Sequence, residues 1–170
     1  MSELKWRPEW QRKEPASIPF NADGSVTFKG PVGDVVLPKE YSDFLQISEG
    51  AALRDRGSWF AGRFDEGVAL FEIEWLGTLR NAMMQTWGYY EVPEQEQHLL
   101  PPTYVFIGYA EPGPSDVVIN VAQGDPDYGK VFVWTPVREP WMTGQNTRGL
   151  GLVADSFNDF MNGLAAKDEL

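Results

Sequence analysis

His98 is the first residue to consider for catalysis, because imidazole is the side chain that most often moves protons near neutral pH. It is the single histidine of the chain, and there is no cysteine. Sites that need two histidines, thiolate catalysis, disulfides and cysteine-held zinc are therefore excluded. A lone histidine would need a serine or aspartate partner, but the chain has no Gly-x-Ser-x-Gly elbow. We expect His98 to be a solvated side chain of a polar loop.

Two segments have the residue types of ligand-binding motifs, but the elements or ligands that such motifs require are missing. Residues 149–154 read Gly-x-Gly-x-x-Ala, yet the helix expected after them is the last one, so the strand–turn–helix context of a dinucleotide site is not met. Residues 125–129, Asp-Pro-Asp-Tyr-Gly, begin like a calcium loop but lack its third acidic ligand and have glycine one position too early. We expect a turn there, and we predict no metal and no cofactor.

No template for a nucleophile, an acid–base pair or a metal centre is satisfied, so the sequence predicts that the chain is not an enzyme. A hydrolase that uses paired carboxylates stays an alternative, because acids far apart in sequence can meet in a fold. Its candidates are Glu91, Glu94 and Glu96, whose joint replacement by glutamine should then abolish turnover.

The distribution of acidic side chains is the stronger signal. The chain has 14 Lys and Arg against 25 Asp and Glu, a net charge of −11, which disfavours nucleic acid and anionic membranes as partners. No Lys or Arg occurs between Arg80 and Lys130. The acids in that interval, most of them in expected loops, are Glu91, Glu94, Glu96, Glu111, Asp116, Asp125 and Asp127. They suggest an anionic face for a basic protein partner; the alternative is a solvated surface whose acids also form turns, Asp116 in particular.

Three helices are expected from apolar spacing. The first covers residues 37–47, with Pro38 in its first turn. The second carries Trp75, Leu79, Met83 and Trp87 at steps of four, with Leu76 beside them. The third begins at Asp155 as the N-cap and has an apolar face made of Phe157, Phe160, Met161 and Leu164.

Strands are expected at residues 25–28, 67–71, 104–109, 116–121 and 130–134, the last three joined by turns rich in Pro and Gly. This order, with no repeat and no linker, predicts one α+β domain. We expect a single core formed by Leu37, Tyr41, Phe44, Leu45, Val105, Ile107, Val118, Val131, Val133, Phe157 and Phe160. The aromatic residues Trp59, Phe60 and Phe64 lie near glycines and could be interface anchors, although core packing is the commoner outcome.

Four short motifs in order resemble the SUKH superfamily, the Smi/Knr-type domain. They are Leu-Pro-x-x-Tyr-x-x-Phe-Leu at residues 37–45, a strand from 100 that ends in Gly108, Gly-x-x-Asp at 113–116, and Ala-Asp-Ser-Phe-x-x-Phe at 154–160. The resemblance covers about residues 30–165. Residues 49–51 read Glu-Gly-Ala where the family often has Asn-Gly-Gly, and Asn120 stands where Asp is frequent.

The resemblance implies a non-enzymatic α+β domain, a mixed and mostly antiparallel sheet flanked by helices. Bacterial members are typically immunity proteins that neutralise toxins, often nucleases, whereas fungal members act in cell-wall assembly and signalling. We therefore expect an immunity protein that uses an acidic face; the alternative is a regulatory or scaffold protein without a toxin partner. The expected plan is a lead-in at residues 1–29, the SUKH-like domain at 30–166 and a polar tail at 167–170.

The N-terminal residues lack the apolar run of a signal peptide, and no stretch of about 18 apolar residues is present, so we expect a cytoplasmic protein. The last four residues, Lys-Asp-Glu-Leu, spell an ER-retention address. Because such an address acts only on proteins of the secretory pathway, we expect this match to be coincidental.

Overall fold

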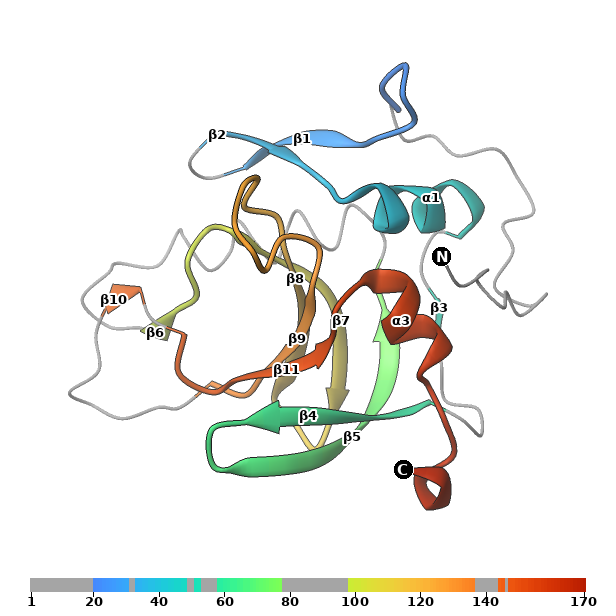
Figure 1. Cartoon of the computed structure of the whole chain (residues 1–170), viewed down its shortest axis with the longest axis vertical. Helices are drawn as coiled ribbons and strands as arrows, with labels where there is room; N and C mark the ends of the chain where they lie inside the picture. The colour runs from blue at the N-terminus through green and yellow to red at the C-terminus, as the bar shows by residue number, and fades with distance from the viewer. Residues whose placement is uncertain are drawn as a thin grey trace.

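A closed ring of antiparallel strands forms the body of the chain (Figure 1). The computed structural model describes residues 20–30, 33–48, 51–52, 58–77, 98–136, 144–145 and 147–170. The ring runs β5–β4–β11–β9–β8–β7 and back to β5, and β3 adds to β5 from outside the ring. The strands of this sheet are β3 (Ala51–Ala52), β4 (Trp59–Phe64), β5 (Gly67–Leu76), β7 (Tyr104–Glu111), β8 (Ser115–Asn120), β9 (Val131–Trp134) and β11 (Leu150–Ala154).

Two smaller strand pairs and two helices complete the description and confirm the α+β class. The ribbon of β1 (Thr27–Gly30) and β2 (Gly33–Val36) is antiparallel, whereas β6 (His98–Leu99) and β10 (Gly144–Gln145) are parallel. Helix α1 spans Lys39–Ile47, helix α3 spans Phe157–Asn162, and a 3-10 turn follows at Lys167–Glu169. The strands expected after residue 103 are confirmed to within a few residues.

Strand β5 closes the ring and corrects the prediction of a helix that begins at Trp75. Its first part pairs with β4 and its last residues pair with β7, where Trp75 lies opposite Tyr109 and Leu76 opposite Gly108. The alternation Phe-Glu-Ile-Glu-Trp at residues 71–75 is a strand pattern, and Phe71 and Ile73 are buried. Period-two alternation therefore outweighed the period-four spacing that Trp75 shares with later residues. The rest of the expected helix, residues 78–87, lies outside the described residues.

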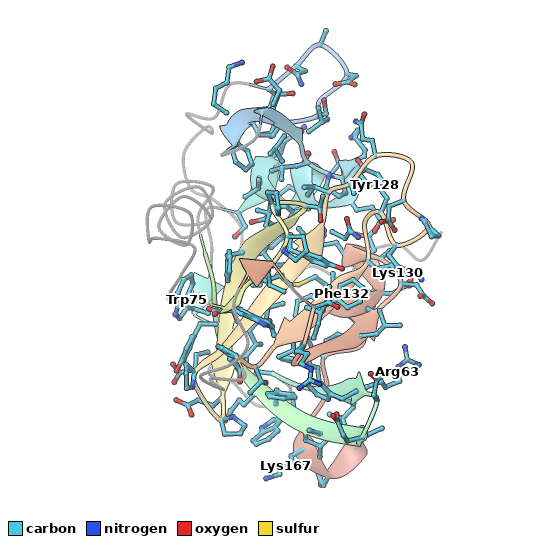
Figure 2. The ribbon with its side chains drawn as sticks, turned by 90° about the vertical axis from the view of Figure 1, so that its left-hand side faces the viewer. Arg63, Trp75, Tyr128, Lys130, Phe132 and Lys167 are labelled. Atoms are coloured by element: carbon cyan, nitrogen blue, oxygen red, sulfur yellow. The ribbon has the colours of Figure 1, made fainter. Side chains whose placement is uncertain are left out.

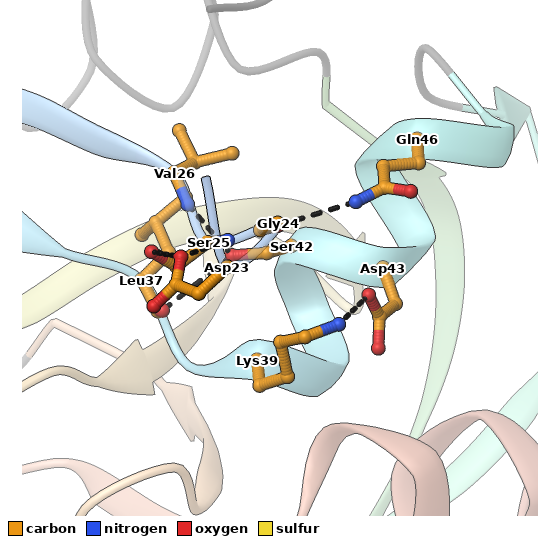
Figure 3. A network of polar contacts seen from close by, with 9 residues as sticks. All are labelled: Asp23, Gly24, Ser25, Val26, Leu37, Lys39, Ser42, Asp43 and Gln46. Atoms are coloured by element: carbon orange, nitrogen blue, oxygen red, sulfur yellow. Dashed lines mark hydrogen bonds and ion pairs between the residues drawn. The ribbon is translucent and has the colours of Figure 1, made fainter. Parts of the chain in front are cut away.

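Helix α1 is fixed to the β1–β2 ribbon by polar contacts (Figure 3). The fully buried hydroxyl of Ser42 accepts the N–H of Val26 at 3.2 Å and donates to the carbonyl of Leu37 at 3.4 Å. On the same helix the Gln46 amide donates to the carbonyl of Gly24 at 3.2 Å. These bonds connect the turn before β1 with both ends of the helix.

Helix α3 begins one residue later than the sequence suggested. Ser156, not Asp155, is its N-cap, and the Ser156 hydroxyl accepts the N–H of Asp159 at 3.1 Å. A second contact comes from far away in the chain, because the Glu40 carboxylate of α1 accepts the N–H of Asn158 at 2.9 Å. This charge-assisted bond joins α1 to the positive end of α3.

The main core fills the ring and extends beneath α1 and α3. Every residue of the expected core belongs to it except Val118, which is fully buried but lies in a second cluster. Residues of β8 face alternate sides, so Val117 and Ile119 point into the ring and Val118 points outward. The second cluster consists of Leu100, Tyr104, Phe106, Val118, Phe132 and Trp134.

Tyr41 places a hydroxyl in the apolar contact between the helices, against the ring of Phe157 at 5.0 Å. Its oxygen is buried and has no hydrogen-bond partner among the residues that the structure describes, and burial raises the pKa of this phenol well above its ordinary value. We therefore expect Tyr41→Phe to increase the free energy of unfolding by about 1 kcal/mol, because it removes an unsatisfied polar group and keeps the ring.

Urea unfolding of the two proteins would measure this difference. Tyr128→Phe is the matched control, since Tyr128 is 36% exposed and the same change should have almost no effect there. A loss of stability in Tyr41→Phe would contradict the prediction and would mean that the hydroxyl is satisfied in solution.

Candidate functional site

The acids of the expected binding face separate into two groups at opposite ends of β8. Glu111 ends β7, just before the hairpin into β8, whereas Asp125 and Asp127 lie in the loop between β8 and β9. A strand of six residues separates these ends by about 18 Å, given a rise of about 3.3 Å per residue. Glu91, Glu94 and Glu96 lie outside the described residues.

The acids of the loop between β8 and β9 have a basic partner, although no Lys or Arg occurs between Arg80 and Lys130 in the sequence. Lys130, at the end of that interval, forms an ion pair with Asp127 at 2.8 Å and lies 3.7 Å from Asp155. The hydrogen bond to Asp127 raises the pKa of the Lys130 ammonium. The Asp125 carboxylate accepts the N–H of Asp127 at 2.7 Å, which confirms a turn at residues 125–129. Both acids therefore shape the loop that carries them.

Asp116 is not a loop residue. It lies in β8, opposite Tyr109 on one side and Trp134 on the other, and it is 7% exposed. The motif Gly-x-x-Asp thus ends inside a strand, just after the turn between β7 and β8. Little of its side chain is available to a partner.

Around Tyr109 the structure gathers a denser acidic group than the sequence suggested. Glu72 of β5 is the direct cross-strand partner of Glu111 in β7, and Glu74 is on the same outer side of β5. Loss of hydration raises the pKa of the Tyr109 phenol, and the nearby carboxylates raise it further: Glu111, Glu74 and Asp116. We call Glu72, Glu74 and Glu111, with Tyr109 and the half-buried Trp75, the Tyr109 acidic surface.

This surface contains a pair of like charges that does not stabilise the fold. Glu72 and Glu111 place like charges directly across two paired strands, an arrangement that lowers stability. The Glu72 carboxylate accepts a hydrogen bond from the Ser58 hydroxyl at 3.3 Å, and that of Glu111 accepts the N–H of Gly113 at 3.2 Å. Among the described residues neither forms an ion pair. In Figure 2, Trp75 lies at the left edge of the molecule, away from Lys130 and Arg63 at the right.

Sequence reasoning misses Glu72 and Glu74 because they fall between the strand expected at residues 67–71 and the helix expected from Trp75. The alternation at residues 71–75 carried the signal, since it places both glutamates on one side of a strand.

The remaining motifs gain a structural explanation. His98 is in β6, paired in parallel with Gly144, and not in a polar loop. The glycines of residues 149–154 precede and enter β11, whereas a dinucleotide turn would follow a strand. Asn120 is 2% exposed, and its side-chain oxygen accepts the N–H of Ala122 at 2.8 Å, as an aspartate there could.

The aromatic residues of β4 are structural. Phe60 is buried in the main core, and Phe64 packs against it. Trp59 pairs with Ala165 through two backbone hydrogen bonds of 3.0 Å, and the Lys167 ammonium lies 4.3 Å from the centre of its ring. Residues 167–170 are exposed, but their first member is held in place by this contact.

In the described part of the chain no group of three or more His, Asp or Glu side chains is arranged to hold a metal ion. Nor does any described helix have the length and apolar character required to cross a membrane.

Comparison with known proteins adds one finding to this geometry. A model of the SMI1/KNR4 family (SUKH-1) matches residues 34–163, which contain the whole ring and helices α1 and α3. No curated protein and no solved structure matches the chain.

Proposed function

Because the chain belongs to the SMI1/KNR4 family (SUKH-1), a family of immunity-type and cell-wall-related domains, we propose that it is an immunity protein that binds a basic toxin domain. The family match over residues 34–163 is the observation that carries this proposal. The net charge of −11 supports a basic partner, since a nuclease must present positive charge to its substrate.

We further propose that the Tyr109 acidic surface receives this partner. Tyrosine and tryptophan are frequent anchors of protein interfaces, and here they lie beside carboxylates on paired strands. A basic side chain placed between Glu72 and Glu111 would relieve their mutual repulsion on binding. The proposal includes Glu91, Glu94 and Glu96 as further contacts for the partner.

The immunity role is tested by searching the genes beside that of this chain for a toxin domain, and by expressing such a domain in one host with and without the chain. Growth that resumes only when the chain is co-expressed would support the proposal. Equal killing with and without the chain would contradict it and would favour the regulatory or cell-wall role of the same family.

The binding surface is tested with the double variant Glu72→Gln and Glu111→Gln. We expect slower association with the toxin domain, by about tenfold at low salt, because steering by charge is lost. The free energy of unfolding should rise by a few tenths of a kcal/mol, roughly the cost of a like-charged cross-strand pair. Stopped-flow association and urea unfolding would measure the two effects.

Asp65→Asn together with Glu66→Gln is the matched control, because both residues are exposed in the turn between β4 and β5. It removes the same charge from another place and should change association far less. Equal slowing by both pairs would show that net charge, and not this surface, guides the partner.

A further inference from the structure

Trp59 borders the Tyr109 acidic surface, although it belongs to β4. It is the direct cross-strand partner of Glu72, and Glu72 is in turn the partner of Glu111. The backbone of Trp59 bonds to Ala165 and not to β5, so Trp59 and Glu72 are a non-hydrogen-bonded pair, the kind whose side chains approach most closely. Trp59, Glu72 and Glu111 thus form one row of side chains across β4, β5 and β7.

A cation from the same chain covers the indole of this row. The Lys167 ammonium lies 4.3 Å from the centre of the Trp59 ring. Lys167 is exposed, and within the described residues it forms no ion pair with Glu72 or with any other carboxylate. In Figure 2 it lies at the lower end of the molecule, apart from Lys130. The contact therefore serves the ring and leaves the carboxylate of Glu72 without a cation.

The segment that carries Lys167 has its own internal hydrogen bonds. We call residues 165–169 the Lys167 strap. Its first residue, Ala165, exchanges two backbone hydrogen bonds of 3.0 Å with Trp59. After Ala165 the Glu169 N–H donates to the Ala166 carbonyl at 3.0 Å, and the Glu169 carboxylate accepts the Ala166 N–H at 3.1 Å. The turn that begins at Ala166 can therefore leave the ring as a unit without breaking a hydrogen bond to another described element.

A guanidinium would fit this place better than the ammonium of Lys167. Arginine stacks its plane on an aromatic ring and donates to a carboxylate with the same group, whereas the Lys167 ammonium has only the ring as a partner among the described residues. An arginine from outside would meet the ring of Trp59 and the carboxylate of Glu72 together. It would also relieve the repulsion between Glu72 and Glu111.

We propose that Trp59 is a subsite of the Tyr109 acidic surface for an arginine of the basic partner, and that Lys167 occupies this subsite until the arginine displaces it. The strap is then an internal competitor, which covers an aromatic ring in the free protein and lowers the affinity for every ligand of the subsite. This inference rests on the proposed function, because it assigns a side chain of the partner to that same surface.

The probe is an acetylated and amidated tetra-arginine peptide, titrated at low salt into the labelled full chain and followed by NMR. We expect saturable shifts at Glu72, Glu111 and the Trp59 indole with a Kd of about 0.1–1 mM, since each exposed ion pair contributes little. In the same titration the amide resonances of residues 166–169 should move toward those of an unstructured segment, because the strap leaves the ring.

A pair of matched variants measures the competition. Lys167→Ala removes the competing side chain and should lower the Kd of the peptide about threefold, as suits the loss of one exposed cation–π contact. Lys29→Ala, on the β1–β2 ribbon, removes an equal charge elsewhere and should change the Kd by less than about 1.5-fold. In the Trp59→Leu background, Lys167→Ala should have no more effect than Lys29→Ala, because the two residues act through one contact.

The outcomes separate this inference from the proposed function. Shifts at Glu72 and Glu111 without any movement of residues 166–169, or equal effects of Lys167→Ala and Lys29→Ala, would overturn the competition and leave the Tyr109 acidic surface standing. Binding of the peptide without shifts at Glu72 and Glu111, or no saturable binding up to about 10 mM, would overturn both.

Discussion

Truncation of Phe157 to alanine should lower the free energy of unfolding by about 3–5 kcal/mol, the usual cost of emptying a well-packed aromatic site. Phe157 is 1% exposed at the start of α3. Its ring lies 5.0 Å from that of Tyr41 and 5.1 Å from that of Phe44, so it joins α3 to α1. The cavity would open between two helices that the strands hold in place and that cannot easily collapse.

Urea unfolding followed by tryptophan fluorescence would measure this loss. Phe44→Ala should show a similar one, because Phe44 is fully buried in the same contact. Val68→Ala is the control, since Val68 is 67% exposed and its truncation should change stability by less than about 0.5 kcal/mol. A loss below about 1 kcal/mol at both phenylalanines would mean that the helix faces are assigned wrongly.

Gly108→Ala should cost about 3 kcal/mol, the second large effect that we expect. A Cβ at Gly108 would lie 2.7 Å from the carbonyl oxygen of Trp75 and 3.2 Å from the Leu76 side chain. The carbonyl belongs to the backbone of β5, so it could retreat only by disturbing the β5–β7 pairing that closes the ring. This close approach explains why β7 needs glycine at this interior position.

Gly113→Ala provides a matched comparison, because the same methyl group meets a movable neighbour. Its nearest atom there is the hydroxyl oxygen of Tyr109, the far end of a side chain that can turn away. We expect a loss of less than about 1 kcal/mol. Thermal unfolding that shows equal losses for the two variants would contradict the backbone explanation.

Local patterns in the sequence determined much of the framework. The spacing of Leu37, Tyr41, Phe44 and Leu45 predicts helix α1 and its buried face, and the structure confirms both. The apolar runs after residue 103, separated by Pro and Gly, predict β7, β8 and β9. Such signals survive folding because they act between residues a few positions apart.

Other features depended on contacts between distant parts of the chain. Trp75 and Leu76 belong to a strand because their backbones pair with β7 on one side and β3 on the other, contacts that a helix at these residues could not make. Val118 and Asp116 point outward because the register of β8 assigns faces by alternation, and that register is set by both of its neighbours.

The candidate binding surface also depends on contacts between distant parts of the chain. The sequence identified Glu111 but grouped it with Asp125 and Asp127, which the structure places at the other end of β8. Glu72 became its partner only through the β5–β7 pairing, across 39 positions of sequence (111 minus 72). Charge and spacing along the chain therefore show that this protein has many acids that could bind a partner. Strand pairing decides which of these acids act together, because carboxylates influence one another over a few ångströms of space, however far apart they lie in sequence.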